Sequence, residues 1–306
     1  MRLDGVGMSE QSYRNGSSSA DKWPAHAQTR PSPGATSAVN RGPVLPRFDP
    51  AKLRRYLPST QRIRIEINGV LAGAPEAIPD ATAEFAIGWA FANRFFASAD
   101  QLGKVSNTAG YASLMVESGI DLDRLKYESI GWIPRADLQV EQSAMVSERA
   151  PRAVSVMSEM DAIATCRQAF DRFDNDGAKA GYIHAALASA DEVVCVARDT
   201  RADAAACKVL GWAISTQFDC MSSMLVVRGV LDGLIVEAAA RAGIPIVATD
   251  AVPTDRAVAI AAHSCVTLLG LALSHRRGLF VDSGHLGEDV ALLSDSDEDP
   301  FEAPDA

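Results

Sequence analysis

Five cysteines are the residues of this chain best suited to nucleophilic chemistry, and they are scattered along its second half. They are Cys166, Cys195, Cys207, Cys220 and Cys265. No two of them form a C-x-x-C pair, which argues against a zinc ribbon or a disulfide framework. An odd, dispersed set of cysteines is typical of a reducing compartment, where most serve as small buried apolar groups.

A group of polar residues could bind a ligand at the end of an apolar strand. Asp250, Thr254 and Asp255 stand between a predicted strand, Ile244–Thr249, and a helix that opens at Pro253 and Thr254. Open α/β sheets bind ligands where strands end and helices begin, because free amides there attract anions. Thr and Asp are also common helix caps. The sequence leaves both roles open.

The residues around this turn predict alternating helices and strands. Apolar residues recur at helical spacing from Leu234 to Ala242, and Gly243 ends that helix. A second helix carries Ala257 to Ala261 on its apolar face, and Val266–Leu269 is a second buried strand. Continuous apolar strands joined by helices predict a parallel or mixed sheet covered on both faces.

The remaining elements follow from the same patterns. The segment Arg62–Val70 alternates charged and apolar residues and turns at Asn68-Gly69, a strong hairpin signal. Further expected elements are a helix over Ala81–Phe96 capped by Asp80, helices over Ser158–Phe170 and Ala202–Trp212, strands over Val193–Ala197 and Met224–Val227, and a helix that begins within Ala180–Leu187 after Gly181.

Composition sets the class of protein. The chain has 306 residues, of which 47% are hydrophobic, enough for one large core or two modest ones. Its net charge of -10 disfavours nonspecific binding of nucleic acid. It has no run of about 18 apolar residues, so we expect no membrane span and a cytoplasmic location.

The chain divides into five predicted parts. The first and last lack apolar periodicity, and the last is strongly acidic, so we expect both to be disordered. The parts are a disordered segment over 1–46, an N-terminal α/β subdomain over 47–134, a linker loop over 135–152, a C-terminal domain over 153–287 and an acidic disordered tail over 288–306.

The order of these motifs resembles the formate dehydrogenase accessory sulfurtransferase family, which is FdhD/NarQ-like. The resemblance is carried by RIRIEINGV, DATAEFAIGWAFANRFF, IHAAL after a glycine, CKVLGWA, VEAAARAGIPIVATDAVPT and TLLGL, between Arg62 and Gly270. It implies an α/β fold with a cytidine-deaminase-like mixed sheet covered by helices and a smaller N-terminal α/β subdomain. It also implies homodimers, binding of the molybdenum guanine dinucleotide cofactor, and sulfur transfer to that cofactor from a cysteine desulfurase.

The chain departs from this family at the residues that carry sulfur. Members have a C-G-x-C-like motif in a loop between their two halves, whereas Ser129–Ala150 contains no cysteine here. A persulfide needs a thiolate sulfur. Two other cysteines could replace the motif: Cys220 lies in a turn-like segment, and Cys207 precedes Lys208, whose charge would lower the thiol pKa. Cys195 and Cys265 lie in or beside apolar strands and are predicted to be core residues.

The resemblance also assigns candidate cofactor-binding residues, namely His184, Gly181, Lys208, Arg228 and Thr254. His184 follows Gly181 and could donate to a phosphate or guanine oxygen, or could make a structural hydrogen bond. Lys208 and Arg228 could pair with a pyrophosphate, or could form ordinary salt bridges.

A zinc site of the deaminase type is not expected, because the chain lacks H-x-E and P-C-x-x-C. Three hypotheses remain. The first is an accessory protein for formate dehydrogenase-like apoenzymes that binds a molybdenum or tungsten cofactor without carrying sulfur itself. The second is a sulfurtransferase that uses Cys207 or Cys220. The third is a partner subunit, without ligand binding, of a complete paralogue.

Overall fold

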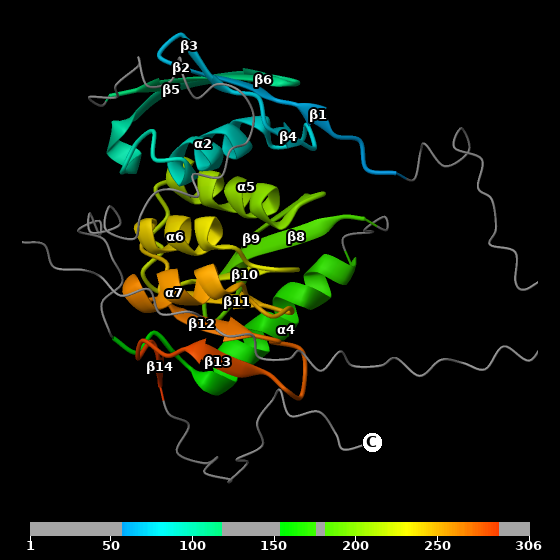
Figure 1. The fold of residues 1–306 in the computed structure, drawn as a ribbon, viewed down its shortest axis with the longest axis vertical. Coiled ribbons are helices and arrows are strands. Elements are labelled where there is room, and N and C mark those ends of the chain that lie inside the picture. The colour runs from blue at the N-terminus through cyan, green and yellow to red at the C-terminus, as the bar shows by residue number, and fades with distance from the viewer. Residues whose placement is uncertain (1–56, 118–153, 176–180, 288–306) are drawn as a thin grey trace, which may run out of the picture. The chain divides into compact units, whose positions relative to one another are not determined.

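The computed structural model describes residues 57–117, 154–175 and 181–287. These residues form a four-stranded sheet, a six-stranded sheet, two short strand pairs and the helices that cover them (Figure 1). None of the described helices is long and apolar enough to cross a membrane. The predicted segments 1–46, 135–152 and 288–306 lie outside the described residues.

The first sheet has the order β3-β2-β6-β5 and packs on one helix, α2. The elements of this part are β1 (Gln61–Arg62), β2 (Arg64–Ile67), β3 (Val70–Gly73), β4 (Glu76–Ala77), α2 (Thr82–Ala92), the short 3-10 helix η1 (Ala99–Gln101), β5 (Leu102–Thr108) and β6 (Tyr111–Val116).

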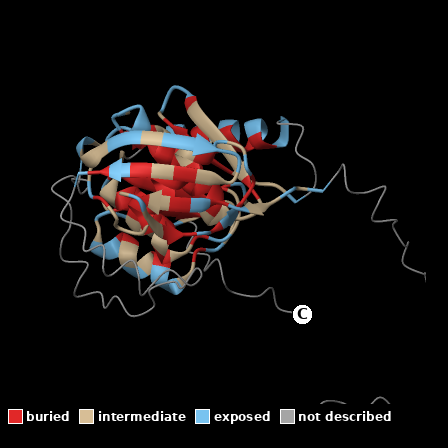
Figure 2. Cartoon of the chain, turned by 90° about the horizontal axis from the view of Figure 1, so that it is seen from above, coloured by how far each residue is buried: buried red, intermediate tan, exposed pale blue. Residues whose placement is uncertain are grey.

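The predicted hairpin at Asn68-Gly69 is confirmed. Strands β2 and β3 pair antiparallel around it, and Asn68 and Gly69 both have positive φ, 50° and 80°. Two successive positive φ values define the tight turn that fits the twist of a hairpin. Seen from above, buried and more exposed residues alternate along strands of this sheet, because one face covers the core (Figure 2).

Helix α2 occupies the predicted position, but its cap differs from the prediction. The N-cap residue is Ala81, with φ 48° and no side-chain cap hydrogen bond, so the prediction that Asp80 caps the helix is wrong. Asp80 instead forms ion pairs with Lys208 and Arg198 on other elements. Competition from two cations explains why the carboxylate does not turn back to the helix amides.

The second sheet has the order β13-β12-β11-β10-β8-β9. Strands β10, β11 and β12 are parallel, while β8 and β13 are antiparallel to their neighbours, so the predicted mixed sheet is confirmed. The elements of this part are β7 (Met157–Ser158), α4 (Glu159–Asn175), β8 (Ile183–Ala188), β9 (Val193–Asp199), α5 (Ala202–Ser215), β10 (Met224–Val227), α6 (Gly233–Arg241), β11 (Ile246–Thr249), α7 (Asp255–His263), β12 (Thr267–Gly270), β13 (Gly278–Val281) and β14 (Leu286–Gly287).

One predicted helix is a strand. The segment Ala180–Leu187 was expected to begin a helix, but Ile183–Ala188 forms β8 between β10 and β9. Its alanines favour a helix by intrinsic propensity. Burial on both faces overrides that preference, because small side chains let helices pack closely against a central strand.

Helices cover both faces of the six-stranded sheet. Helices α5, α6 and α7 lie on one face, and α4 lies on the other (Figure 1). Helix α2 packs on α5, so a single apolar cluster runs from the first sheet through both helices to the second sheet. This cluster crosses the predicted boundary between the two subdomains, whose division stays a prediction.

Candidate functional site

Several strands of the second sheet end at the same edge. Strands β10, β11 and β12 are parallel, so their carboxyl ends lie side by side. The residues after these ends are Arg228–Leu231, Asp250–Thr254 and Leu271–Arg277, which we call the carboxyl rim. Ligands of open α/β sheets bind outside such strand ends. The rim is therefore the candidate site.

Hydrogen bonds connect the three loops of the carboxyl rim. The Thr254 amide donates to the Leu231 carbonyl at 3.1 Å, and the Leu271 amide donates to the Ala251 carbonyl at 3.2 Å. The Thr254 hydroxyl accepts from the Ala257 amide at 3.2 Å and caps α7. Of the two roles left open for Thr254, the structure shows the cap.

Arg228 is held at the rim by aromatic rings and carboxylates. Its guanidinium carbon lies 5.3 Å from the ring centroid of Phe170 and 5.5 Å from that of Phe173. It also pairs with Asp174 at 2.9 Å and with Asp250 at 3.8 Å. The side chain remains 26% exposed. Fixed orientation and partial exposure suit a guanidinium for binding an anion.

His184 lies next to Arg228 but beneath the surface. It is on β8, fully buried, and its ring stacks on Phe173 with centroids 5.2 Å apart. Its carbonyl accepts a hydrogen bond from the Arg228 amide at 2.9 Å. Gly181, two residues before β8, has φ 102°. The Phe173 ring therefore contacts both the His184 ring and the Arg228 guanidinium. A direct contact of the His184 ring with a ligand stays a prediction.

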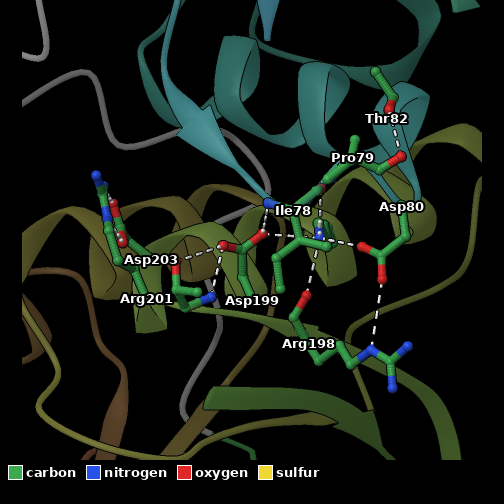
Figure 3. Close-up of polar contacts among 10 residues, drawn as sticks. Ile78, Pro79, Asp80, Thr82, Arg198, Asp199, Arg201 and Asp203 are labelled. Carbon is green, nitrogen blue, oxygen red and sulfur yellow. Dashed lines mark hydrogen bonds and ion pairs between the residues drawn. The ribbon is translucent and has the colours of Figure 1, made fainter. Parts of the chain in front are cut away.

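Lys208 lies on the other face of the sheet, on α5. Its side chain is 1% exposed, and its ammonium nitrogen lies 2.8 Å from an Asp199 carboxylate oxygen and 2.9 Å from the Arg198 carbonyl oxygen. It also donates to the Ile78 carbonyl oxygen and to Asp80, which point toward the same centre in Figure 3. Four acceptors thus surround three ammonium hydrogens, and this cation is fully neutralised by the protein.

The Lys208 cluster joins the first half of the chain to the second. Asp199 accepts hydrogen bonds from the Ile78 amide at 3.0 Å and from the Thr200 amide at 2.7 Å. Ile78 and Asp80 lie in the segment just before α2, whereas Asp199 and Lys208 belong to β9 and α5. The observed contacts are structural, and binding of a pyrophosphate by Lys208 stays a prediction that these contacts do not favour.

The structure places all five cysteines. Burial raises the pKa of Cys166 and Cys220 to about 12, that of Cys195 to about 11, and that of Cys207 well above its usual value. The expected lowering of the Cys207 pKa by Lys208 is wrong, because burial dominates and Lys208 is engaged by Asp199. Cys265, expected in the core, is exposed at the turn before β12 with φ 54°.

The basic part of the rim was not among the residues predicted from the sequence. His275, Arg276 and Arg277 are exposed in the loop between β12 and β13. Their signal was a run of three basic residues directly after an apolar strand in an acidic chain. No cluster of metal-ligating side chains was found among residues 57–117, 154–175 and 181–287.

Comparison with known proteins identifies the family. The profile of the FdhD/NarQ family matches residues 59–286, a range that includes both sheets and the carboxyl rim. The chain belongs to the FdhD/NarQ family. The family membership expected from the sequence motifs is thereby confirmed, and the match includes the segment between the two halves in which this FdhD/NarQ chain has no cysteine.

A solved structure shares the fold of this FdhD/NarQ chain. It is the crystal structure of a protein from Desulfotalea psychrophila described as a formate dehydrogenase accessory protein. The TM-score is 0.59 at 20% sequence identity, over 72% of this chain and 86% of that chain. At this identity the likeness concerns the fold alone. No curated protein sequence matched the chain.

Proposed function

We propose that the chain is an accessory protein in the maturation of formate dehydrogenase-type molybdenum enzymes. The observation that carries this proposal is the FdhD/NarQ profile match over residues 59–286. The fold shared with a protein described as a formate dehydrogenase accessory protein supports it. Its client is a formate dehydrogenase-like apoenzyme, and the homodimer and the cytoplasmic location implied earlier stay predictions.

The proposed cargo is the molybdenum guanine dinucleotide cofactor, held at the carboxyl rim. This cofactor carries a pyrophosphate. One guanidinium group can donate two parallel hydrogen bonds to phosphate oxygens. Arg228 offers an oriented guanidinium there, and Arg276 and Arg277 add two exposed ones. The Gly229 amide is engaged by Asp250 at 2.7 Å, so the cations rather than this backbone group would neutralise the phosphates.

We further propose that the chain does not carry sulfur. A persulfide carrier needs an accessible thiolate, with a pKa near or below neutrality. Cys207 and Cys220, the two candidates for a relocated carrier, are buried and their pKa values are raised. Protonated, enclosed thiols are poor nucleophiles, which disfavours the sulfurtransferase alternative. The partner-subunit alternative differs from the proposal in predicting no binding of nucleotide.

Titration with GDP tests the proposed site, because GDP contains the guanine and the pyrophosphate of the cofactor. Isothermal titration would compare the wild-type chain with Arg228→Gln and with Arg167→Gln, a control at an exposed arginine of α4. We expect Arg228→Gln to weaken binding about ten-fold or more, since hydrogen bonds to charged groups contribute about 1.5–3 kcal/mol.

The possible outcomes separate the hypotheses. Equal dissociation constants for the three proteins would show that Arg228 does not contact GDP. Absence of GDP binding by the wild-type chain would overturn cofactor binding and favour the partner-subunit hypothesis.

A further inference from the structure

Asp250 is the one acidic residue of the carboxyl rim. The other residues of the rim that are charged at neutral pH are Arg228, Arg276 and Arg277. Because like charges repel, a carboxylate beside Arg228 weakens the attraction of this site for phosphate groups. The position of Asp250 is therefore better explained by another part of the ligand than by its phosphates.

The Asp250 carboxylate is fixed through one oxygen and available at the other. Its Oδ1 atom accepts a hydrogen bond from the Gly229 amide at 2.7 Å. Its Oδ2 atom lies 3.8 Å from the Arg228 Nε atom, too far for a hydrogen bond, and accepts none from the described part of the chain. Each carboxylate oxygen has two lone pairs, and the side chain is 26% exposed. The carboxylate can therefore accept hydrogen bonds from a ligand without giving up its own.

Hydrogen bonds hold this carboxylate at the junction of β10 and β11, by which we mean the loops Arg228–Leu231 and Asp250–Thr254. The Thr249 hydroxyl donates to the Gly229 carbonyl, and the Thr254 amide donates to the Leu231 carbonyl at 3.1 Å. The bond from the Gly229 amide to Asp250 is a third link between the same strand ends. The orientation of the carboxylate is thus set before any ligand binds.

Each of the two loops at this junction exposes a valine. Val230 is 58% exposed and Val252 is 43% exposed. Val230 directly follows Gly229, and Val252 is two residues after Asp250. Ligand sites typically combine apolar surface, which covers the ligand, with a few fixed polar groups, which orient it. The junction therefore suits a flat ring that carries hydrogen-bond donors on one edge.

We propose that Asp250 selects guanine over other bases at the carboxyl rim, by accepting hydrogen bonds from its N1–H and 2-amino groups. Guanine presents these two donors side by side, which matches the two oxygens of a carboxylate. Adenine presents an acceptor nitrogen at the matching position and would be repelled. This assignment rests on the proposed cofactor site, in which the arginines bind the phosphates.

Nucleotides that differ only in the base test the selection. Isothermal titration of the full-length chain would compare GDP with inosine diphosphate, which lacks the 2-amino group, and with ADP. We expect affinity to fall in that order, by about ten-fold or more at each step, because each step removes a hydrogen bond to a charged group. A site that binds only phosphates would not distinguish the three.

The variant Asp250→Asn should change the preferred base. Its amide oxygen can keep the hydrogen bond from Gly229, whereas its amide nitrogen donates where Oδ2 accepted. Xanthosine diphosphate carries a carbonyl oxygen in place of the 2-amino group of GDP and therefore matches this donor. We expect the variant to bind GDP at least about ten-fold more weakly than wild type does, and to prefer xanthosine diphosphate to GDP.

Asp174→Asn is the matched control, because Asp174 also pairs with Arg228, at 2.9 Å. If Asp250→Asn acted only by changing the charge beside the guanidinium, both variants would alter the binding of every nucleotide alike. We expect Asp174→Asn to leave the ratio of GDP affinity to ADP affinity unchanged. Asp171→Asn, at an exposed position of α4, should leave both affinities unchanged, and circular dichroism would confirm that all variants fold.

The outcomes separate this inference from the proposed function. Equal affinities of the wild-type chain for GDP and ADP, or an Asp250→Asn variant that still prefers GDP to xanthosine diphosphate, would overturn the selection of guanine by Asp250 and leave the proposed function standing. A wild-type chain that binds none of these nucleotides would overturn the proposed cofactor site, and the role of Asp250 with it.

Discussion

Gly88 on α2 and Gly211 on α5 face each other where the two helices cross backbone to backbone. A Cβ atom at Gly88 would lie 1.8 Å from the Cys207 carbonyl oxygen, and one at Gly211 would lie 1.8 Å from the Glu84 carbonyl oxygen. Neither position can hold a side chain without a shift of the helices. Through this crossing, α2 of the predicted N-terminal subdomain packs directly on α5 of the predicted C-terminal domain.

Substitution of either glycine by alanine should separate these helices. We expect Gly88→Ala and Gly211→Ala each to lower the free energy of unfolding by at least about 2 kcal/mol, because overpacking of a close-packed contact typically costs about 1–3 kcal/mol. Urea denaturation measures the effect. Gly278→Ala is the control, since a Cβ there would meet nothing within 4 Å. Equal effects at Gly88 and Gly278 would contradict the close crossing.

Removal of the buried ammonium should destabilise the chain more than removal of an exposed one. Lys208→Met leaves the buried Asp199 carboxylate without its cation. Breaking a buried pair in this way costs about 3–5 kcal/mol, whereas Lys104→Met at an exposed position of β5 should have little effect. Adding Asp199→Asn to Lys208→Met should recover part of the loss. No recovery in this double-mutant cycle would argue against direct coupling.

The fold was more predictable than the contacts between its halves. The helices and strands between Gly233 and Gly270 and the Asn68-Gly69 hairpin could be predicted, because their periodicity and turn residues are local signals. The β8 strand was missed, because its alanines favour a helix and only its neighbours β9 and β10 impose a strand. The pairing of Asp80 with Lys208 is equally nonlocal, so Asp80 was mistaken for a cap.

Asp232 gives the stability of the chain a defined pH dependence. Its side chain caps α6 by accepting from the Ile235 amide at 3.1 Å, and burial raises its pKa above the usual 3.8. The folded carboxyl therefore binds its proton more tightly than the unfolded one. Its contribution to stability falls as the pH rises from about 3.8 through the raised folded pKa, and it is least favourable at neutral pH.

The variant Asp232→Asn removes that dependence and keeps the cap, since its amide oxygen can accept the same hydrogen bond. Its stability relative to wild type should therefore increase from pH 4 to pH 7, as measured by thermal denaturation. Asp232→Ala, which loses the cap, should cost about 1 kcal/mol. A difference between Asp232→Asn and wild type that stays constant with pH would contradict a raised pKa.

Cys265 should be far more reactive than the three buried thiols. Cys265 is exposed, whereas burial raises the pKa values of Cys166, Cys207 and Cys220. We expect a thiol reagent at pH 8 to modify Cys265 rapidly in the folded chain and these three only after denaturation, because the thiolate is the reacting species. Peptide mass spectrometry identifies the modified residue. Rapid native modification of Cys207 or Cys220 would revive the relocated-carrier hypothesis.

The candidate site was only partly predictable from the sequence. Arg228 and Thr254 could be placed at strand ends, because the strands themselves were recognisable. The burial of His184 depends on stacking with Phe173, a residue of another element. The Lys208 ammonium is bound by Asp199 and by the carbonyl oxygen of Ile78, and Ile78 is distant in sequence. Exposure of Cys265 depends on a turn with positive φ, which the adjacent apolar strand conceals.

The most direct test of the account is the ability of a chain without cysteines to mature a formate dehydrogenase. The variant would combine Cys166→Ala, Cys195→Ala, Cys207→Ala, Cys220→Ala and Cys265→Ser, since alanine avoids burying hydroxyls at the enclosed positions. Formate dehydrogenase activity would be measured in cells that lack the natural chain, with circular dichroism confirming that the variant folds. We predict that the variant without cysteines supports the same formate dehydrogenase activity as the wild-type chain. Loss of activity with a folded variant would contradict maturation without sulfur transfer by this chain.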